Sequence, residues 1–148
     1  MAAAQQQLLI VIVTGYRLFT DYTRFCKEVD AALGRSMPSL MVFGDEPYGT
    51  DTLAQRYATE RKLSSIKFCA DVKHMGEKDC IVVSDWKTGH KGAAGPIRNA
   101  IMLRYADEHA KSVHVIGFLS SMSKGTKNCL GIATKQYKRF TRTVIPVT

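Results

Sequence analysis

The sequence predicts an α/β protein: a Rossmann-like three-layer domain with a mostly parallel sheet of about five strands. Short, wholly apolar segments recur along the chain, which is typical of strands buried on both faces of a parallel sheet. Between them lie longer segments whose apolar residues are spaced like one face of a helix. The length of 148 residues is that of one domain. We therefore expect residues 1–148 to form a single domain, with residues 1–7 flexible.

Five segments have the character of strands. The first, residues 8–13, has the sequence LLIVIV and ends at Thr14 and Gly15. The second, residues 40–43, has the sequence LMVF and is followed by a loop with two glycines and a proline. The other three are residues 80–84, 113–118 and 144–147.

Four segments predict helices, namely residues 22–33, 50–63, 96–106 and 125–138. In the first, Phe25 and Val29 lie on one face, and Gly34 is a plausible stop. The third begins at Pro96, where the missing N–H costs no hydrogen bond. Residues 64–79 are undecided, because 66–70 fit either a strand or a helix.

The net charge indicates what kind of partner the protein binds, and the composition excludes a membrane-spanning protein. The 21 basic and 13 acidic residues give a formal net charge of +8, which favours an anionic partner: nucleic acid, a nucleotide or an acidic membrane. A solubilising surface explains the same charge. The longest apolar run is six residues, far below a membrane span, and the first residues lack the basic region of a secretory signal. We expect a cytoplasmic protein that uses neither a membrane nor a cofactor.

The cysteines predict free thiols. Cys26, Cys69, Cys80 and Cys129 form no C-x-x-C motif and have no histidine at metal-ligand spacing. Without a secretion signal, buried or unreactive thiols in a reducing compartment are the expectation, and no metal site is expected.

Ligands of open parallel sheets bind beyond the carboxyl ends of the strands, and the first two loops there carry suitable residues. Gly15 lets the backbone approach a ligand and Arg17 can grip a phosphate, although a plain glycine turn fits as well. In the next loop, Asp45 can accept a hydrogen bond from a sugar hydroxyl. Thr50 or Asp51 can cap the following helix, and capping is the leading interpretation of Asp51.

The other two loops also lead into helix starts. Arg98 and Asn99 fall in the first turn after Pro96, beside free amides that bind anions. An arginine there opposes the helix dipole, which favours a role toward a ligand. Three serines, a lysine and a glycine in residues 120–125 form either a phosphate cradle or a hydroxyl-rich cap. A basic stripe follows at Lys135, Lys138, Arg139 and Arg142.

Four strings in these loops resemble one family. They are VTGYRLFTDY from Val13, FGDEPYGTDTLA from Phe43, DWKTGHKGAAGPIRNAIML from Asp85 and SKGTKNC from Ser123. Together they resemble the YspA/YpsA-related family of the SLOG superfamily, which also holds the Lonely-guy (LOG) hydrolases and DprA. The GAAGP-x-RN part is highly specific.

The resemblance implies a Rossmannoid domain that binds a nucleotide-derived ligand. Family members are thought to sense or process such ligands, including NAD-derived and ADP-ribose-like ones, often in host–virus or phage conflict, and to form homo-oligomers. The ligand-binding residues implied are Gly15, Arg17, Gly44, Asp45, Gly49, Asp51, Gly95, Arg98, Asn99, Ser123, Gly125 and Thr126.

Three departures from the family pattern bear on catalysis. Phe43 stands where the family usually has a histidine, and residues 64–79 resemble an insertion. LOG hydrolases use a glutamate with an arginine to cleave an N-glycosidic bond. Here Arg98 matches the arginine, but Cys129 stands in place of the glutamate. A thiol cannot readily replace that carboxylate.

Three functions follow from the sequence. The leading hypothesis is a sensor or sequestering protein for an ADP-ribose-like or NAD-like signal, most plausibly a homodimer. The alternative is a LOG-like hydrolase of an N-glycosidic or phosphate bond. Its candidate acids are Asp45, Glu46 and Asp85, with His90 as a possible base and Arg98 as a further catalytic residue. A DprA-like nucleic-acid binder ranks third, because no row of stacking aromatic residues accompanies the basic stripe.

Overall fold

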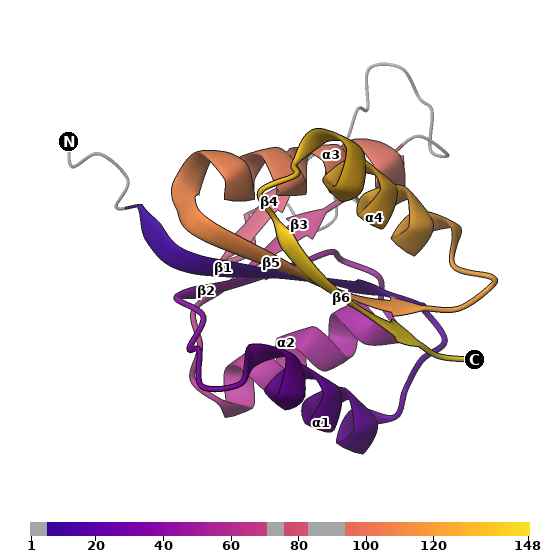
Figure 1. Ribbon diagram of the computed structural model, residues 1–148. Coiled ribbons are helices and arrows are strands. Elements are labelled where there is room, and N and C mark those ends of the chain that lie inside the picture. The colour runs from indigo at the N-terminus through magenta and orange to yellow at the C-terminus, as the bar shows by residue number, and fades with distance from the viewer. Residues whose placement is uncertain (1–5, 71–75, 83–93) are drawn as a thin grey trace.

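The computed structural model describes residues 6–70, 76–82 and 94–148, whose six strands form one parallel sheet between two layers of helices (Figure 1). The strands are β1 (Gln7–Gly15), β2 (Leu40–Phe43), β3 (Ser65–Cys69), β4 (Cys80–Val82), β5 (Ala110–Leu119) and β6 (Thr141–Pro146). The helices are α1 (Tyr22–Leu33), α2 (Thr50–Glu60), α3 (Ala94–His109) and α4 (Lys124–Gln136). The order across the sheet is β4-β3-β2-β1-β5-β6, so the predicted Rossmann-like fold is confirmed.

Strand β1 is the centre of the sheet because its side chains are apolar on both faces. It pairs in parallel with β2, where Ile10 faces Leu40, and with β5, where Ile10 faces Val113. Ile10 and Ile12 pack toward one helical layer, and Val11 and Val13 toward the other. A continuous apolar run is what a strand covered on both sides requires.

The two layers of helices cover opposite faces of the sheet, as Figure 1 shows for α1 and α2 below and α3 and α4 above. Phe25 of α1 and Tyr57 of α2 pack in one core cluster, whereas Leu103 of α3 and Leu130 of α4 pack in the other. Helix α1 starts where Asp21 Oδ1 accepts a hydrogen bond from the Arg24 amide at 3.0 Å. The sequence predicted all four helices, with bounds that differ by up to three residues.

The undecided segment contains a strand of the sheet. Residues 65–69 form β3, which lies between β2 and β4 and adds a strand to the number expected. Phe68 is buried against the α3–α4 side, and Ile66 packs against the same cluster. This alternation of apolar residues is typical of a strand. That residues 64–79 are an insertion stays a prediction.

The structure corrects the expectation of four free thiols. Cys69, at the end of β3, forms a disulfide with Cys80, at the start of β4. The pairing follows from β3 and β4 being neighbours, which no cysteine motif in the sequence indicates. Cys26 and Cys129 are free, and Cys129 is buried.

Two further findings concern the outside of the molecule. No helix in the described part of the chain is both long and apolar enough to span a membrane. Strand β6 is an outer strand of the sheet, and Val144 on it is 46% exposed. The homodimer that the sequence predicts stays a prediction.

Candidate functional site

A cavity of about 420 Å³ lies at the carboxyl ends of β1 and β5. Strand β1 connects to β2 on one side, while β5 pairs with β1 on the other, so the direction of winding reverses between β1 and β5. Such a switch point is where open α/β sheets bind ligands. The described residues that line the cavity are Thr14, Gly15, Tyr16, Arg17, Glu46, Asp51, Arg98, Met122, Ser123, Lys124, Gly125 and Thr126.

Two glycines bring the first two loops together. A Cβ atom on Gly15 would lie 2.5 Å from Thr50 Oγ1, and this hydroxyl donates a hydrogen bond to the Tyr16 carbonyl at 2.9 Å. Gly49 has a φ of 77°, and a side chain there would overlap the Arg17 carbonyl. Only glycine fits this close approach and this backbone conformation. Gly49 therefore acts by holding the loop that presents Arg17.

Arg98 joins α3 to the loop after β2. Its Nη1 donates to Asp45 Oδ1 at 2.9 Å, and its Nη2 donates to Asn99 Oδ1 at 3.2 Å. The side chains of Arg98 and Asp45 are only 11% and 6% exposed. A Cβ on Gly44 would lie 3.0 Å from the Arg98 guanidinium carbon, so Gly44 makes room for the pair. Asp45 is consequently a positioning residue for Arg98.

Asp51 does not cap α2, contrary to expectation. The N-cap residue is Gly49, no side chain caps the helix, and Thr50 bonds to Tyr16 instead. Asp51 is 7% exposed, lines the cavity, and accepts a hydrogen bond from the Glu46 amide at 3.1 Å. Burial raises the pKa of Asp51 to about 6, although nearby Arg98 lowers it. Asp51 can therefore exchange a proton near neutral pH.

The start of α4 forms the opposite wall of the cavity. Ser123 is its N-cap residue, but the Ser123 hydroxyl accepts from the Ser120 amide at 3.0 Å and does not cap the helix. Asn99 Nδ2 donates to the Gly125 carbonyl at 3.2 Å, which ties α3 to this turn. Nothing lies within 4 Å of where a Gly125 side chain would begin. The first turn of α4 thus opens to the cavity, and unpaired amides in such a turn attract anions.

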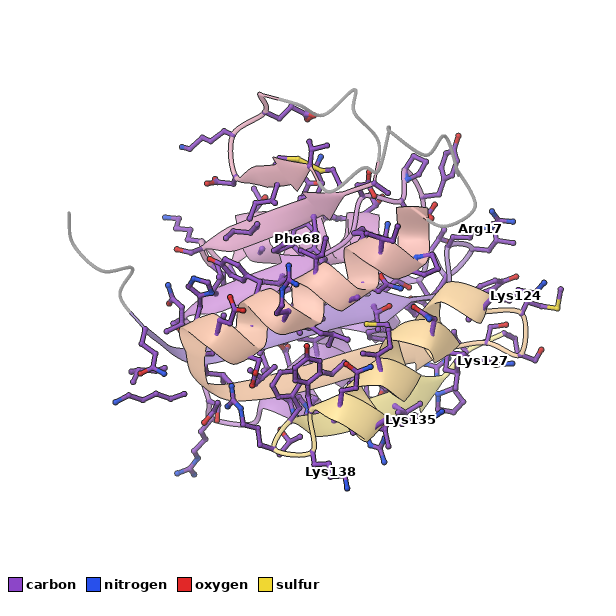
Figure 2. The ribbon with its side chains drawn as sticks, turned by 90° about the horizontal axis from the view of Figure 1, so that it is seen from above. Arg17, Phe68, Lys124, Lys127, Lys135 and Lys138 are labelled. Carbon is purple, nitrogen blue, oxygen red and sulfur yellow. A yellow bond between two sulfur atoms is a disulfide. The ribbon has the colours of Figure 1, made fainter. Side chains whose placement is uncertain are left out.

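Two cations stand at this wall. Arg17 and Lys124 are exposed and line the cavity, with Arg17 after β1 and Lys124 at the start of α4, and Figure 2 shows both near this end of α4. Among the ion pairs between described residues, none involves either side chain. The cavity therefore offers positive charge near the free helix end.

Cys129 lies behind the cavity and is fully buried. Burial raises the pKa of its thiol to about 12, although Arg98 and a hydrogen bond with Thr14 lower it. The thiol is consequently neutral at physiological pH. Cys129, which the sequence resemblance matches to the LOG glutamate, therefore carries no charge.

The structure brings together seven of the twelve ligand-binding residues that the sequence predicts. Those that line the cavity are Gly15, Arg17, Asp51, Arg98, Ser123, Gly125 and Thr126. The others lie outside its lining, namely Gly44, Asp45, Gly49, Gly95 and Asn99. Helix α3 begins at Ala94, so Arg98 and Asn99 lie in its second turn, not in its first as expected.

Sequence reasoning missed three lining residues, Thr14, Tyr16 and Met122, whereas it had placed Lys124 in the phosphate cradle and Glu46 among the candidate acids of a hydrolase. All are neighbours of predicted ones in the same loops, so their position after a strand was the available signal. Asp85 and the loop of residues 85–93 lie outside the described residues. The described part of the chain holds no cluster of three or more His, Cys, Asp or Glu residues suited to a metal ion.

Residues 9–74 match the model of a family described as the YspA, cpYpsA-related SLOG family. This match supports the family resemblance over 66 of the 148 residues, in the part of the chain that carries the first two loops. Helices α3 and α4, which complete the cavity, lie beyond the matched segment. No curated protein and no solved structure matches the chain.

Proposed function

We propose, starting from the match of residues 9–74 to the model of the YspA, cpYpsA-related SLOG family, that the protein binds a nucleotide-derived small molecule in the cavity between β1 and β5. The observation that carries the proposal is the division of charge across the cavity. Arg17, Lys124 and the free end of α4 form a cationic wall, whereas Glu46 and Asp51 supply carboxyl groups on the loop after β2 and the start of α2.

The cationic wall suits a phosphate group. Amides at a helix N-terminus donate hydrogen bonds to anions, and the helix dipole adds to their attraction. Arg17 can bind two phosphate oxygens at once, and Lys124 adds a mobile ammonium group. Met122, which is 73% exposed, gives this wall an apolar surface against which a flat base can pack.

The acidic side suits a ribose. Carboxylates accept hydrogen bonds from sugar hydroxyls in dinucleotide sites. Glu46 is exposed and Asp51 is buried, so they can receive different hydroxyls of one sugar. Arg98, fixed by Asp45, keeps the negative charge of this side partly balanced. ADP-ribose and related NAD-derived molecules combine phosphates with ribose hydroxyls, and we propose them as the ligand class.

Binding without efficient turnover is the form of the function that we propose. The neutral thiol of Cys129 leaves the position of the LOG glutamate without a carboxylate. In this form the protein senses or sequesters its ligand.

One observation favours a hydrolase as the second candidate. Asp51 lines the cavity and, with a pKa of about 6, can donate or accept a proton at neutral pH. If the protein is an enzyme, Asp51 is consequently a better candidate for acid–base catalysis than Asp45, which is held by Arg98.

The test is a thermal-shift panel with AMP, NAD, ADP-ribose, its cyclic forms and cyclic oligonucleotides, followed by chromatography of the recovered ligand. We expect at least one phosphorylated ribose compound to raise the melting temperature and to be recovered intact. Recovery of cleaved ligand selects the hydrolase. A panel in which no compound shifts the melting temperature contradicts the proposal.

A further inference from the structure

Positive charge is concentrated at one end of the sequence. Residues 111–148 contain seven Lys and Arg residues and no Asp or Glu, so they carry nearly all of the formal net charge of +8. They form most of β5, all of α4 and all of β6, which lie together at one side of the sheet. Such asymmetry indicates a surface for a polyanion more than a general solubilising charge.

The lysines of this region form a stripe. Lys124, Lys127, Lys135 and Lys138 are exposed and follow one another along α4 and just past its end, as Figure 2 shows. Their spacing places them within one face of a helix with 3.6 residues per turn. Gly131, near the middle of this face, adds no side chain. From Lys124 to Lys135 the stripe is about 17 Å long, at about 1.5 Å per residue.

The stripe is not neutralised by nearby carboxylates. Helix α4 contains no acidic residue, and none of the ion pairs between described residues involves the four lysines. Arg139, by contrast, bonds to Asp107 at 2.9 Å and is removed from the stripe. The charge of the four lysines is thus available to a partner.

The stripe runs into the cavity. Lys124 belongs to both, and Arg17, which also lines the cavity, lies near the same end of α4 in Figure 2. On the basis of the proposed nucleotide site, we propose that this surface binds a single-stranded nucleic acid whose terminal nucleotide enters the cavity. Its following phosphates lie along Lys127, Lys135 and Lys138.

The dimensions and chemistry of the stripe fit such a strand. A length of about 17 Å matches about five nucleotides stacked at about 3.4 Å. An acidic membrane fits less well, because membrane-surface helices pair their cations with a large exposed apolar face. The apolar side of α4, with Cys129, Leu130 and Ala133, is buried in the core.

The test measures fluorescence anisotropy of an internally labelled single strand of about twelve nucleotides at about 50 and about 200 mM salt. The stripe variant is Lys127→Gln/Lys135→Gln/Lys138→Gln. The control variant, Lys27→Gln/Arg35→Gln/Lys62→Gln, loses the same charge from exposed residues of the α1–α2 side. AMP binding, measured in parallel, reports on the nucleotide site alone.

We expect the stripe variant to bind the strand at least about tenfold more weakly at low salt, with a salt slope shallower by about two, while the control variant keeps wild-type affinity. AMP binding should be unchanged in both variants, and saturating AMP should weaken binding of the strand. Equal losses of affinity for the strand in the two variants, or no loss in either, contradict the proposal that the lysine stripe binds the strand. Binding to phosphatidylserine vesicles but not to the strand overturns it in favour of a membrane. Absence of AMP binding, with the loss specific to the stripe, contradicts the nucleotide site and the entry of the strand's end.

Discussion

Arg98 lines the cavity and contacts Asp45 behind it. Because Arg98 is buried, replacing it by alanine should affect the stability of the fold as well as ligand binding. From the sequence alone, Arg98 was interpreted as a ligand-binding residue in the first turn of its helix, where an arginine adds little to stability. In the structure the side chain is 11% exposed and forms an ion pair with an Asp45 side chain that is 6% exposed. Removing one partner of a buried pair leaves the other charge uncompensated and costs roughly 3–5 kcal/mol. We therefore expect Arg98→Ala to lower the free energy of unfolding by about that amount.

Urea denaturation at neutral pH measures this loss. Arg104→Ala is the matched control, because Arg104 is exposed on the same helix, and a change within about 0.5 kcal/mol is expected there. Adding Asp45→Asn to Arg98→Ala should restore part of the lost stability, since it removes the buried carboxylate charge that faced Arg98. Equal stability of Arg98→Ala and Arg104→Ala would show that the pair is not buried as described.

Asp51 should make stability depend on pH. Its pKa is about 6 in the folded protein and 3.8 ordinarily, so the folded state binds more protons between these values. Stability contributed by the protonated group is therefore present below pH 4 and lost as the pH rises through 6, at a cost of about 3 kcal/mol. Asp51→Asn removes the titrating group.

The measurement is the difference in unfolding free energy between wild type and Asp51→Asn from pH 4 to 7. We expect the stability of wild type to fall relative to the variant as the pH rises. A difference that does not vary with pH would mean that Asp51 is ionised throughout and accessible to water.

Gly49 is predicted to be indispensable for the loop structure. Its φ of 77° and the overlap of any side chain with the Arg17 carbonyl act together. Gly34 is the control, because its φ is 58° but nothing lies within 4 Å of its Cβ position. We expect Gly34→Ala to cost about 1–2 kcal/mol from the backbone alone, and Gly49→Ala to cost at least about 1 kcal/mol more. Equal costs in denaturation experiments would argue against the close approach of the two loops.

At the scale of elements, periodicity predicted most of the structure. The apolar run of β1 and the helical stripe of α1 are local patterns, and both elements form where expected. The segment of β3 was undecided, because five residues with a lysine in the middle are too short to separate strand from helix. What decides it is pairing with β2 and β4, which is a contact between distant parts of the chain.

In the sequence resemblance, Cys129 of α4 matches the position of the LOG glutamate, and we therefore expect no efficient N-glycosidase activity. A neutral thiol gives up electrostatic stabilisation worth about 3–4 kcal/mol, or a factor of hundreds in rate. The assay is release of free base from AMP and NAD by wild type, Cys129→Glu and Asp51→Asn. Slow release by wild type that Cys129→Glu accelerates fits the account. Robust release by wild type that Asp51→Asn or Asp45→Asn abolishes would identify a different catalytic acid.

At the scale of the whole molecule, the sequence indicated at which edge of the sheet the site lies. It did not indicate which of the predicted residues line the cavity and which hold other residues in place. Parallel strands bring the ends of β1 and β5 together, so Gly15, Arg17 and the residues from Ser123 onward were expected to meet. The sequence could not show that Asp45 forms an ion pair with Arg98, because the two residues are 53 positions apart in the chain. For the same reason, Asp51 was interpreted as a cap when only its place at a helix start was visible.

The net charge could also be read from the sequence, but only the fold shows which lysines share one exposed face. The sequence predicted a phosphate cradle that includes Lys124 and, separately, a basic stripe that begins at Lys135. Helix α4 joins these lysines on one exposed face that reaches the cavity (Figure 2). The cavity and the stripe are therefore parts of one cationic side of the molecule.

The central claim is that the cavity binds the phosphate of a nucleotide through Arg17, Lys124 and the start of α4. Isothermal titration of AMP and ADP-ribose into wild type and into Arg17→Ala/Lys124→Ala tests it directly. Both side chains are exposed, so the double variant should fold, and each charge-assisted contact is worth about 1.5–3 kcal/mol, or about 10- to 150-fold in affinity. The account predicts saturable binding to wild type and a loss of at least about tenfold in the variant. Equal affinity of the two proteins, or no binding to wild type, would contradict it.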